Sequence, residues 1–179
     1  MTLLGCLLHG GLRHRARLYT AGLALAAAVL AGCAMPERVA PGTPVAQAVQ
    51  QLGAPTARYP AGQGEGAGER LQYSWQPAGK RVYNLDVDAQ GRVTRVEQAL
   101  QEGLFGQRIR PGTWTRADVL REYGPPAQVM GVHNFDGVIW VWRYDNGPFP
   151  RLLYIDIDPA GVVRGYSSGD EYPPEPRER

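Results

Sequence analysis

Thiols and imidazoles are scarce in this 179-residue chain. It contains two cysteines, Cys6 and Cys33, and His133 is the single histidine that follows Cys33. If the chain is cut before Cys33, no second thiol remains, which excludes a disulfide framework and a cysteine-based zinc site. One histidine without a neighbouring thiol also provides no metal cluster and no cysteine–histidine pair. We therefore predict no metal site and no cofactor.

A strong excess of one charge sign is also missing beyond residue 32. The 147 residues from Cys33 onward contain 16 basic and 17 acidic residues. A large nucleic-acid-binding surface needs a basic face, so this balance argues against nucleic acid as a partner. With 44% hydrophobic residues, the chain has the composition of a soluble protein and room for one medium domain or two small ones.

Acidic residues are absent from the first 32 positions, which have the organisation of a targeting segment. Basic residues within 13–17 precede an apolar run at 21–30. A membrane-spanning helix needs about 20 apolar residues. The shorter run seen here is typical of the hydrophobic region of a signal peptide. We therefore predict that residues 1–32 are a signal peptide.

The residues that end this segment resemble the bacterial lipobox. Leu30, Ala31 and Gly32 lie directly before Cys33. The resemblance implies that Cys33 is diacylated on its sulfur, becomes the new N-terminus and is then N-acylated. Each buried methylene contributes ~0.8 kcal/mol, so two or three acyl chains hold a protein firmly on a bilayer. An ordinary signal peptide or anchor helix with an incidental cysteine is the alternative.

The residue after the lipobox cysteine indicates where the protein is sorted. It is Ala34 rather than aspartate. In the enterobacterial sorting rule, aspartate at this position favours retention in the inner membrane. By that resemblance, we expect a lipid-anchored protein of the outer membrane that faces the periplasm.

Three blocks of sequence recur in the same order at offsets of 70 or 71 residues. The matched pairs are 39–43 with 109–113, 52–55 with 123–126, and 85–93 with 155–163. Such a recurrence predicts a tandem duplication. The first unit is expected at 33–100 and the second at 101–169, followed by a disordered Pro- and charge-rich tail at 170–179.

Each unit is predicted to begin with a short helix. In the first unit Thr43 is the N-cap candidate, Pro44 takes the first helical position and Gly53 ends the helix. In the second unit Thr115 and Asp118 have the spacing of a capping box. A further helical turn is expected in the link at 101–110.

Three antiparallel strands are predicted to follow each helix, because period-2 alternation is interrupted by short turns. The expected strands are 71–75, 81–87 and 92–98 in the first unit, and 138–144, 151–157 and 162–166 in the second. A Gly-rich loop is expected at 61–69. The predicted fold class is therefore α+β: two tandem units, each with a short helix or two packed on a three-stranded antiparallel sheet.

Two turns also resemble calcium-binding loops. Residues 86–91, with Glu97 at the twelfth place, almost fit that pattern, and a weaker copy begins at Asp156. Strands rather than helices are expected on both sides. A tight turn explains Asp-x-x-Gly better, with the aspartate accepting local backbone bonds and Gly91 or Gly161 at positive φ.

Residues for catalysis are poorly represented. His133 is expected in a loop, and a Ser-His-Asp triad would have to recruit Ser74, Ser167 or Ser168. None of these serines lies in a nucleophile-elbow sequence. We therefore predict that the protein is not an enzyme.

Aromatic residues on two corresponding strands are the candidate partner-binding residues. They are Tyr73 and Trp75 in the first unit, and Trp140, Trp142 and Tyr144 in the second. Core packing is the simpler interpretation. A partner-binding sheet face is the functional one, because tryptophan and tyrosine dominate binding hot spots.

These features together resemble a known family. A Gly-Thr opening, an apolar helix ending in Leu-Gly-x-Pro, aromatic strands and the Leu-Asp-x-Asp-x-x-Gly-x-Val hairpin resemble the SmpA/OmlA (BamE) family of small outer-membrane lipoproteins. The resemblance covers about 130 residues as two tandem copies, whereas the assembly factor of that family has a single unit. Secreted β-lactamase inhibitor proteins share the plan in duplicated form.

The resemblance implies a non-catalytic function. The leading expectation is an accessory or interaction factor in envelope biogenesis, with a protein partner in the machinery that assembles β-barrel outer-membrane proteins. The alternative, from the inhibitor proteins, is a binding or inhibitor module for an envelope or secreted enzyme.

Overall fold

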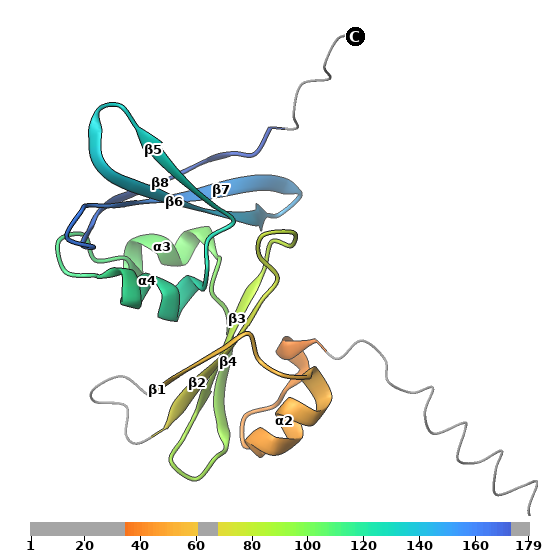
Figure 1. Cartoon of the computed structure of the whole chain (residues 1–179). Helices are drawn as coiled ribbons and strands as arrows, with labels where there is room; N and C mark the ends of the chain where they lie inside the picture. Colours follow the sequence, from red (N-terminus) through yellow and green to blue (C-terminus); the bar gives the residue numbers. More distant parts are fainter. Residues whose placement is uncertain (1–34, 61–67, 173–179) are drawn as a thin grey trace, which may run out of the picture. The chain divides into compact units, whose positions relative to one another are not determined.

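Two four-stranded antiparallel sheets make up most of the computed structural model, which describes residues 35–60 and 68–172 (Figure 1). The predicted signal peptide, Cys33 and its lipobox lie outside the described residues, as do 61–67 of the predicted loop and 173–179 of the predicted tail. Within the described ranges, no helix is long and apolar enough to cross a membrane.

The first repeat contains one α-helix and the first sheet. A 3-10 turn, η2 (Pro36–Arg38), precedes α2 (Val45–Leu52). The strands, in sheet order, are β1 (Ala57–Pro60), β2 (Glu69–Ser74), β3 (Val82–Val87) and β4 (Val93–Gln98). The predicted strands of this repeat are confirmed within two residues at each end.

The second repeat has the same strand order after two helices. These are α3 (Glu102–Arg108), which confirms the helical turn expected in the link, and α4 (Arg116–Tyr123). The strands are β5 (Gln128–Val132), β6 (Phe135–Asn146), β7 (Phe149–Ile157) and β8 (Val163–Asp170). The last strand runs one residue past the expected end of the second unit, and Glu171 ion-pairs with Arg143.

Each sheet has four strands, so the predicted three-stranded sheets are wrong in number. The additional strand, β1 or β5, follows the helix and pairs with the next strand along the chain. β1 is only four residues long and ends at Pro60. β5 contains Gly131 and lacks the polar–apolar alternation of a half-buried strand. Neither segment therefore has a strong strand pattern.

The helix caps confirm one prediction and correct another. Thr115 and Asp118 form the predicted capping box at α4. Thr43 is not the N-cap of α2: Pro44 is, and no side chain caps that helix. The Thr43 hydroxyl instead donates to the carbonyl of Ala40, 2.7 Å away, in the turn that precedes the helix.

The predicted hairpin turns occur at the same place in both repeats. Gly91 and Gly161 have φ values of 71° and 83°. The carboxylate of Asp88 accepts hydrogen bonds from the amides of Gln90 and Arg92. These contacts confirm the turn interpretation of Asp-x-x-Gly.

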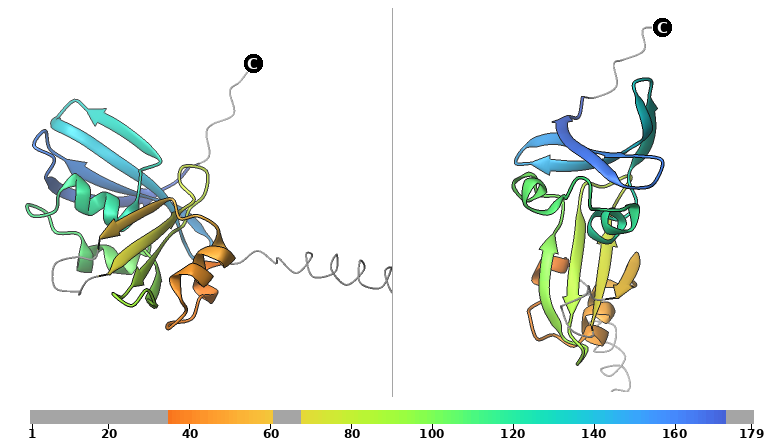
Figure 2. Two further views of the ribbon diagram at one scale, coloured as in Figure 1. Left: turned by 60° about the horizontal axis from the view of Figure 1, so that its bottom comes forward. Right: turned by 90° about the vertical axis from the view of Figure 1, so that its left-hand side faces the viewer.

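Helices pack on both sheets and produce two cores, with α2 on the first sheet and α3 and α4 on the second (Figure 2). In the first core the apolar stripe of α2, centred on the fully buried Ala48, packs on Leu71 and Leu85. The second core lies between the second sheet and the helices α3 and α4, with Phe105 and Tyr123 at its centre. It also includes buried residues from β3 and from the segment after β4, so the two repeats share apolar contacts.

Candidate interaction sites

Three of the five aromatic residues singled out as partner-binding candidates are buried. Trp142 and Tyr144 have no exposed surface and Tyr73 is 7% exposed. Tyr144 makes an edge-to-face contact with Phe105, with ring centroids 5.3 Å apart. Burial of this kind favours the core interpretation for these three side chains, which a partner cannot reach in this structure.

Two of the buried aromatic residues have a specific structural role that is repeated in both units. The Trp142 indole nitrogen donates to the carbonyl of Gly124, 3.2 Å away. At the matching position of the first repeat, the Tyr73 hydroxyl donates to the carbonyl of Gly53, 3.1 Å away. Each glycine ends the helix of its repeat. The aromatic side chain therefore fixes the helix end to the sheet.

Trp75 and Trp140 are the accessible members of the set. Trp75 is 41% exposed and stands edge-on to Tyr83, with ring centroids 5.3 Å apart. Trp140 is half-buried beside Trp142 and lies opposite Val129 of β5. Of the five aromatic candidates, only Trp75 and Trp140 are accessible to a partner in this structure.

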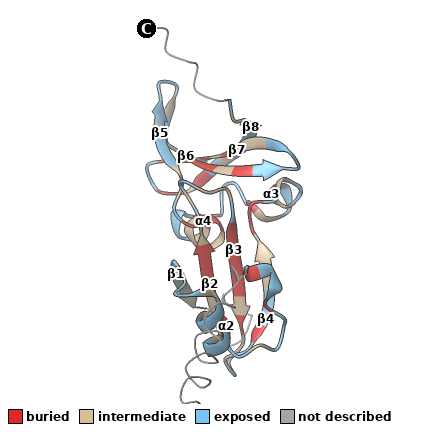
Figure 3. Ribbon diagram, turned by 90° about the vertical axis from the view of Figure 1, so that its right-hand side faces the viewer, coloured by how far each residue is buried: buried red, intermediate tan, exposed pale blue. Residues whose placement is uncertain are grey.

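A polar network that sequence reasoning missed joins the two repeats. It lies on the face of the first sheet opposite α2 (Figure 3). The Gln72 amide donates to Asn84, 3.1 Å away, and also to the carbonyls of Leu120 and Arg121 at the end of α4. Asn84 donates to the carbonyl of Glu122 at 2.8 Å. These bonds supply donors to carbonyls in the last turn of α4, where a helix runs out of its own donors; the Leu120 carbonyl also accepts from the Gly124 amide.

Ion pairs extend this network. Arg70 contacts Asp86 at 2.6 Å and Glu122 at 2.7 Å, and Arg108 contacts both Glu122 and Glu97. Burial lowers the pKa of Arg70, but its two carboxylate partners outweigh this and raise the pKa overall. Partly buried ion pairs add little net stability, whereas loss of one partner is costly because it leaves a buried charge. We infer that the ion pairs define how the repeats dock.

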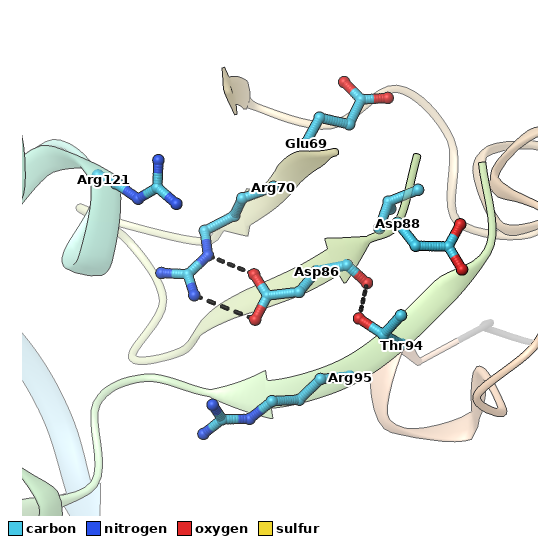
Figure 4. Close-up of a pocket in the computed structure, with 8 residues that line it drawn as sticks. Glu69, Arg70, Asp86, Asp88, Thr94, Arg95 and Arg121 are labelled. Atoms are coloured by element: carbon cyan, nitrogen blue, oxygen red, sulfur yellow. Dashed lines mark hydrogen bonds and ion pairs between the residues drawn. The ribbon is translucent and has the colours of Figure 1, made fainter. Parts of the chain in front are cut away.

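A pocket of about 360 Å³ opens beside this network (Figure 4). Its lining residues are Glu69, Arg70, Asp86, Val87, Asp88, Thr94, Arg95 and Arg121. In Figure 4, Arg70 points at the Asp86 carboxylate, and Arg121 from α4 lies beside them. The Arg121 side chain contacts the carbonyl of Pro60. Of the residues that line the pocket, Arg70 and Arg121 therefore take part in the contact between the repeats, through Glu122 and Pro60.

A second pocket, of about 480 Å³, lies where the described chain begins. Met35, Trp75, Lys80 and Asp145 are among its lining residues. Lys80 contacts Asp145 at 3.1 Å and Glu171 at 3.2 Å. Burial raises the pKa of Glu171, but hydrogen bonds from Arg143 and Lys80 outweigh it and lower the pKa overall. The basic groups of this region are thus matched by carboxylates.

The residues considered for metal binding and catalysis are dispersed. His133 is exposed in the turn between β5 and β6. Asp86 is engaged by Arg70, and Asp158 accepts from the Val162 amide and from Arg164. The Val162 amide is the main cause of the lowered pKa of Asp158. Over residues 35–60 and 68–172, no group of three histidine, cysteine, aspartate or glutamate side chains is placed to hold a metal ion.

Comparison with known proteins yields one structural similarity. No family model matches the chain, and neither does any curated protein. The solved structure of a DUF4309 family protein (YjgB) from Bacillus subtilis aligns over 72% of this chain and 79% of that chain, at 16% identity and a TM-score of 0.30. A similarity at this level carries no argument about the fold or the function of this chain.

Proposed function

We propose that this protein is a non-catalytic lipoprotein, anchored to the outer membrane and facing the periplasm, that acts as an accessory interaction factor in the assembly of β-barrel outer-membrane proteins. The observation on which this rests is the Leu-Ala-Gly-Cys sequence that ends at Cys33, directly after a basic segment and a short apolar run. The sequence resemblance to the SmpA/OmlA (BamE) family supports the same function.

Accessible apolar side chains also support an interaction function. Trp75, Val129 and Val132 are between 40% and 53% exposed. Two of these three lie on one five-residue strand, β5. Apolar groups exposed on one short strand favour contact with another macromolecule.

A second candidate function is a binding or inhibitor module for an envelope or secreted enzyme. It is favoured by the tandem repeat, which the Gln72–Asn84 network and the Arg70 ion pairs hold in a defined arrangement. Secreted β-lactamase inhibitor proteins resemble this chain in having two such units.

The anchor is tested by replacing Cys33 with serine. We expect Cys33→Ser to abolish palmitate labelling and to move the protein out of the membrane fraction. Cys6→Ser is the matched control, because Cys6 lacks a preceding apolar run, and it should label normally. Normal labelling and fractionation of Cys33→Ser would refute the lipoprotein proposal.

The two functions are separated by a crosslinking pull-down from intact envelopes and by deletion of the gene. An assembly factor should crosslink to the outer-membrane insertase, and its loss should lower barrel-protein levels and increase sensitivity to large antibiotics. An intact barrier with normal barrel levels would favour the inhibitor-like module.

A further inference from the structure

The two sheets differ in the strand that forms their first edge. β1 carries Arg58, which contacts Glu69 at 2.8 Å, and it ends at Pro60. β5 has the sequence Gln-Val-Met-Gly-Val, without a charge or a proline. Charged residues and prolines on an edge strand hinder pairing with another chain. The first sheet is protected in this way at β1, whereas β5 has neither a charge nor a proline and its only irregularity is a register shift between Met130 and Val132.

The side chains of β5 are open to solvent. Val129 is 53% exposed and Val132 is 40% exposed, and β5 is drawn as largely exposed in Figure 3. A Cβ atom added at Gly131 would meet no heavy atom within 4 Å. The faces of this strand are therefore not covered by other parts of the described chain.

The backbone of β5 is paired on one side within the described chain. Its neighbour in the sheet is β6, and the order β5-β6-β7-β8 places it at the edge. Such an edge presents N–H and C=O groups that match another extended chain. The opposite edge, β8, ends in the polar run from Ser167 to Asp170, and Asp170 is paired with Arg151.

Side chains beside this edge define the chemistry of its partner. Val129 lies opposite Trp140, and Met130 lies opposite Ile139 on the other face of the sheet. An added strand would place alternate side chains next to Val129, on the face that carries the half-buried Trp140. Apolar residues at alternate positions fit there, and charges do not.

We propose that β5 binds an extended polypeptide segment with apolar residues at alternate positions, as an added strand of the second sheet. The strands of outer-membrane barrel proteins have this alternation, so the site specifies how the proposed assembly factor would hold its client. The inference rests on the proposed function for the identity of the client, but the strand-binding reaction can be measured by itself.

The binding test uses the full chain in detergent micelles and a fluorescent peptide. The peptide alternates valine and threonine over ten residues and has lysines at both ends. A second peptide is N-methylated at alternate residues, which removes the amide donors of one edge but keeps every side chain. We expect the methylated peptide to bind about tenfold more weakly or worse, because strand addition depends on backbone hydrogen bonds.

Two variants test whether the peptide binds at β5 or at the opposite edge of the sheet. Val129→Lys adds a charge to the proposed edge and should weaken binding about tenfold or more, as charges on natural edge strands do. Ser167→Lys adds the same charge to an exposed position on the other edge of the same sheet and should leave binding within about twofold. Urea melts of both variants establish that they are folded. Peptide binding should also slow hydrogen exchange at the β5 amides.

Several results would overturn the proposal. Equal binding of the methylated peptide would show that side chains alone are recognised, and unchanged binding by Val129→Lys would place the site elsewhere. Sedimentation in the absence of peptide tests a third outcome. If the chain is a dimer that Val129→Lys dissociates, a second copy occupies the edge.

A crosslinking experiment separates this inference from the proposed function. A photoreactive residue is placed at position 129 or at position 167 in the membrane-anchored protein, and adducts are collected from envelopes. Adducts with barrel proteins from position 129, but not from position 167, would support both strand addition at β5 and the proposed function. Crosslinks to the assembly machinery at other positions, with none at 129, would leave the proposed function standing and refute strand addition.

Discussion

The two repeats share a strand order, a helix-end contact and a hairpin turn, yet the outer faces of their sheets differ. In the first repeat, the cross-strand pair Gln72 and Asn84 holds the end of α4. In the second repeat, the paired positions on the matching face are Val141 and Tyr154. The shared features are those that each unit needs to fold. The difference shows that one face has become specialised to receive its neighbour.

The largest expected effect concerns the aromatic residue that contacts the helix end. Trp142→Ala should lower the free energy of unfolding by about 3–5 kcal/mol, because it removes a fully buried indole and its bond to Gly124. Trp75→Ala, at a 41% exposed position of the first repeat whose ring contacts Tyr83, should cost less, about 0.5–1.5 kcal/mol. Urea melts measure both. Comparable stability of the two variants would contradict the assignment of Trp142 to the core.

The contact between the repeats can be weakened from the first sheet. Asn84→Leu should lower the free energy of unfolding by about 1–3 kcal/mol, since it removes the donor of the Glu122 carbonyl and one of the three acceptors of the Gln72 amide. Gln47→Leu, on the exposed side of α2, is the control. Hydrogen exchange should show the two sheets of Asn84→Leu opening separately. If Asn84→Leu has wild-type stability and its two sheets unfold in a single transition, the network has no docking role.

The shared turns provide a test in which both repeats should respond alike. Gly161→Val and Gly91→Val should each destabilise by roughly 1 kcal/mol or more, because a β-branched residue tolerates positive φ poorly. Space is not the cause, since the nearest atoms to an added Cβ are 3.6 Å away at both sites. Gly103→Ala, at an open helical position, should not destabilise. Widely different melting temperatures for the two turn variants would contradict the equivalence of the two repeats.

The smallest expected effect concerns how the free energy of unfolding depends on pH. The pKa of Glu171 is lowered in the folded state from its ordinary value of 4.5. Its contribution to stability is therefore present above that value and is lost as the pH falls through the folded-state pKa. Glu171→Gln should cost at most about 1 kcal/mol at pH 7, and this cost should shrink below about pH 4. Urea melts at pH 7, 5 and 3.5 measure the trend, with Asp136→Asn as the exposed control. A cost that is constant with pH would exclude the ion pairs as its source.

Local sequence signals predicted much of the fold. The duplication, six of the eight strands, the α4 capping box and the glycine turns depend on residues that are close together in the sequence. The missed strands depend on pairing with the next strand instead. For Thr43, two local hydrogen bonds were possible, and the turn at Ala40 competes successfully with the helix cap.

The interaction residues were less predictable, because their environment comes from the other repeat. Gln72 and Asn84 alternate with apolar residues along their strands, which is the pattern of a solvent-facing side. Burial by α4 depends on a contact 48 or 38 residues away in the chain. Conversely, the aromatic stripe has the composition of a binding surface, although three of its five residues are buried and two of those, Tyr73 and Trp142, attach a helix end to a sheet.

The corresponding pair of positions in the second sheet has no side-chain amide, and this bears on how copies of the chain could associate. A protein whose two ends are complementary can add copies head to tail and form an open filament. Here the helix-receiving surface of the first repeat is already filled from within the chain. Val141 and Tyr154 offer no side-chain amide to a helix end arriving from another molecule. The helix-docking contact of the first repeat is therefore made within the chain and is not offered again by the corresponding pair of positions in the second repeat.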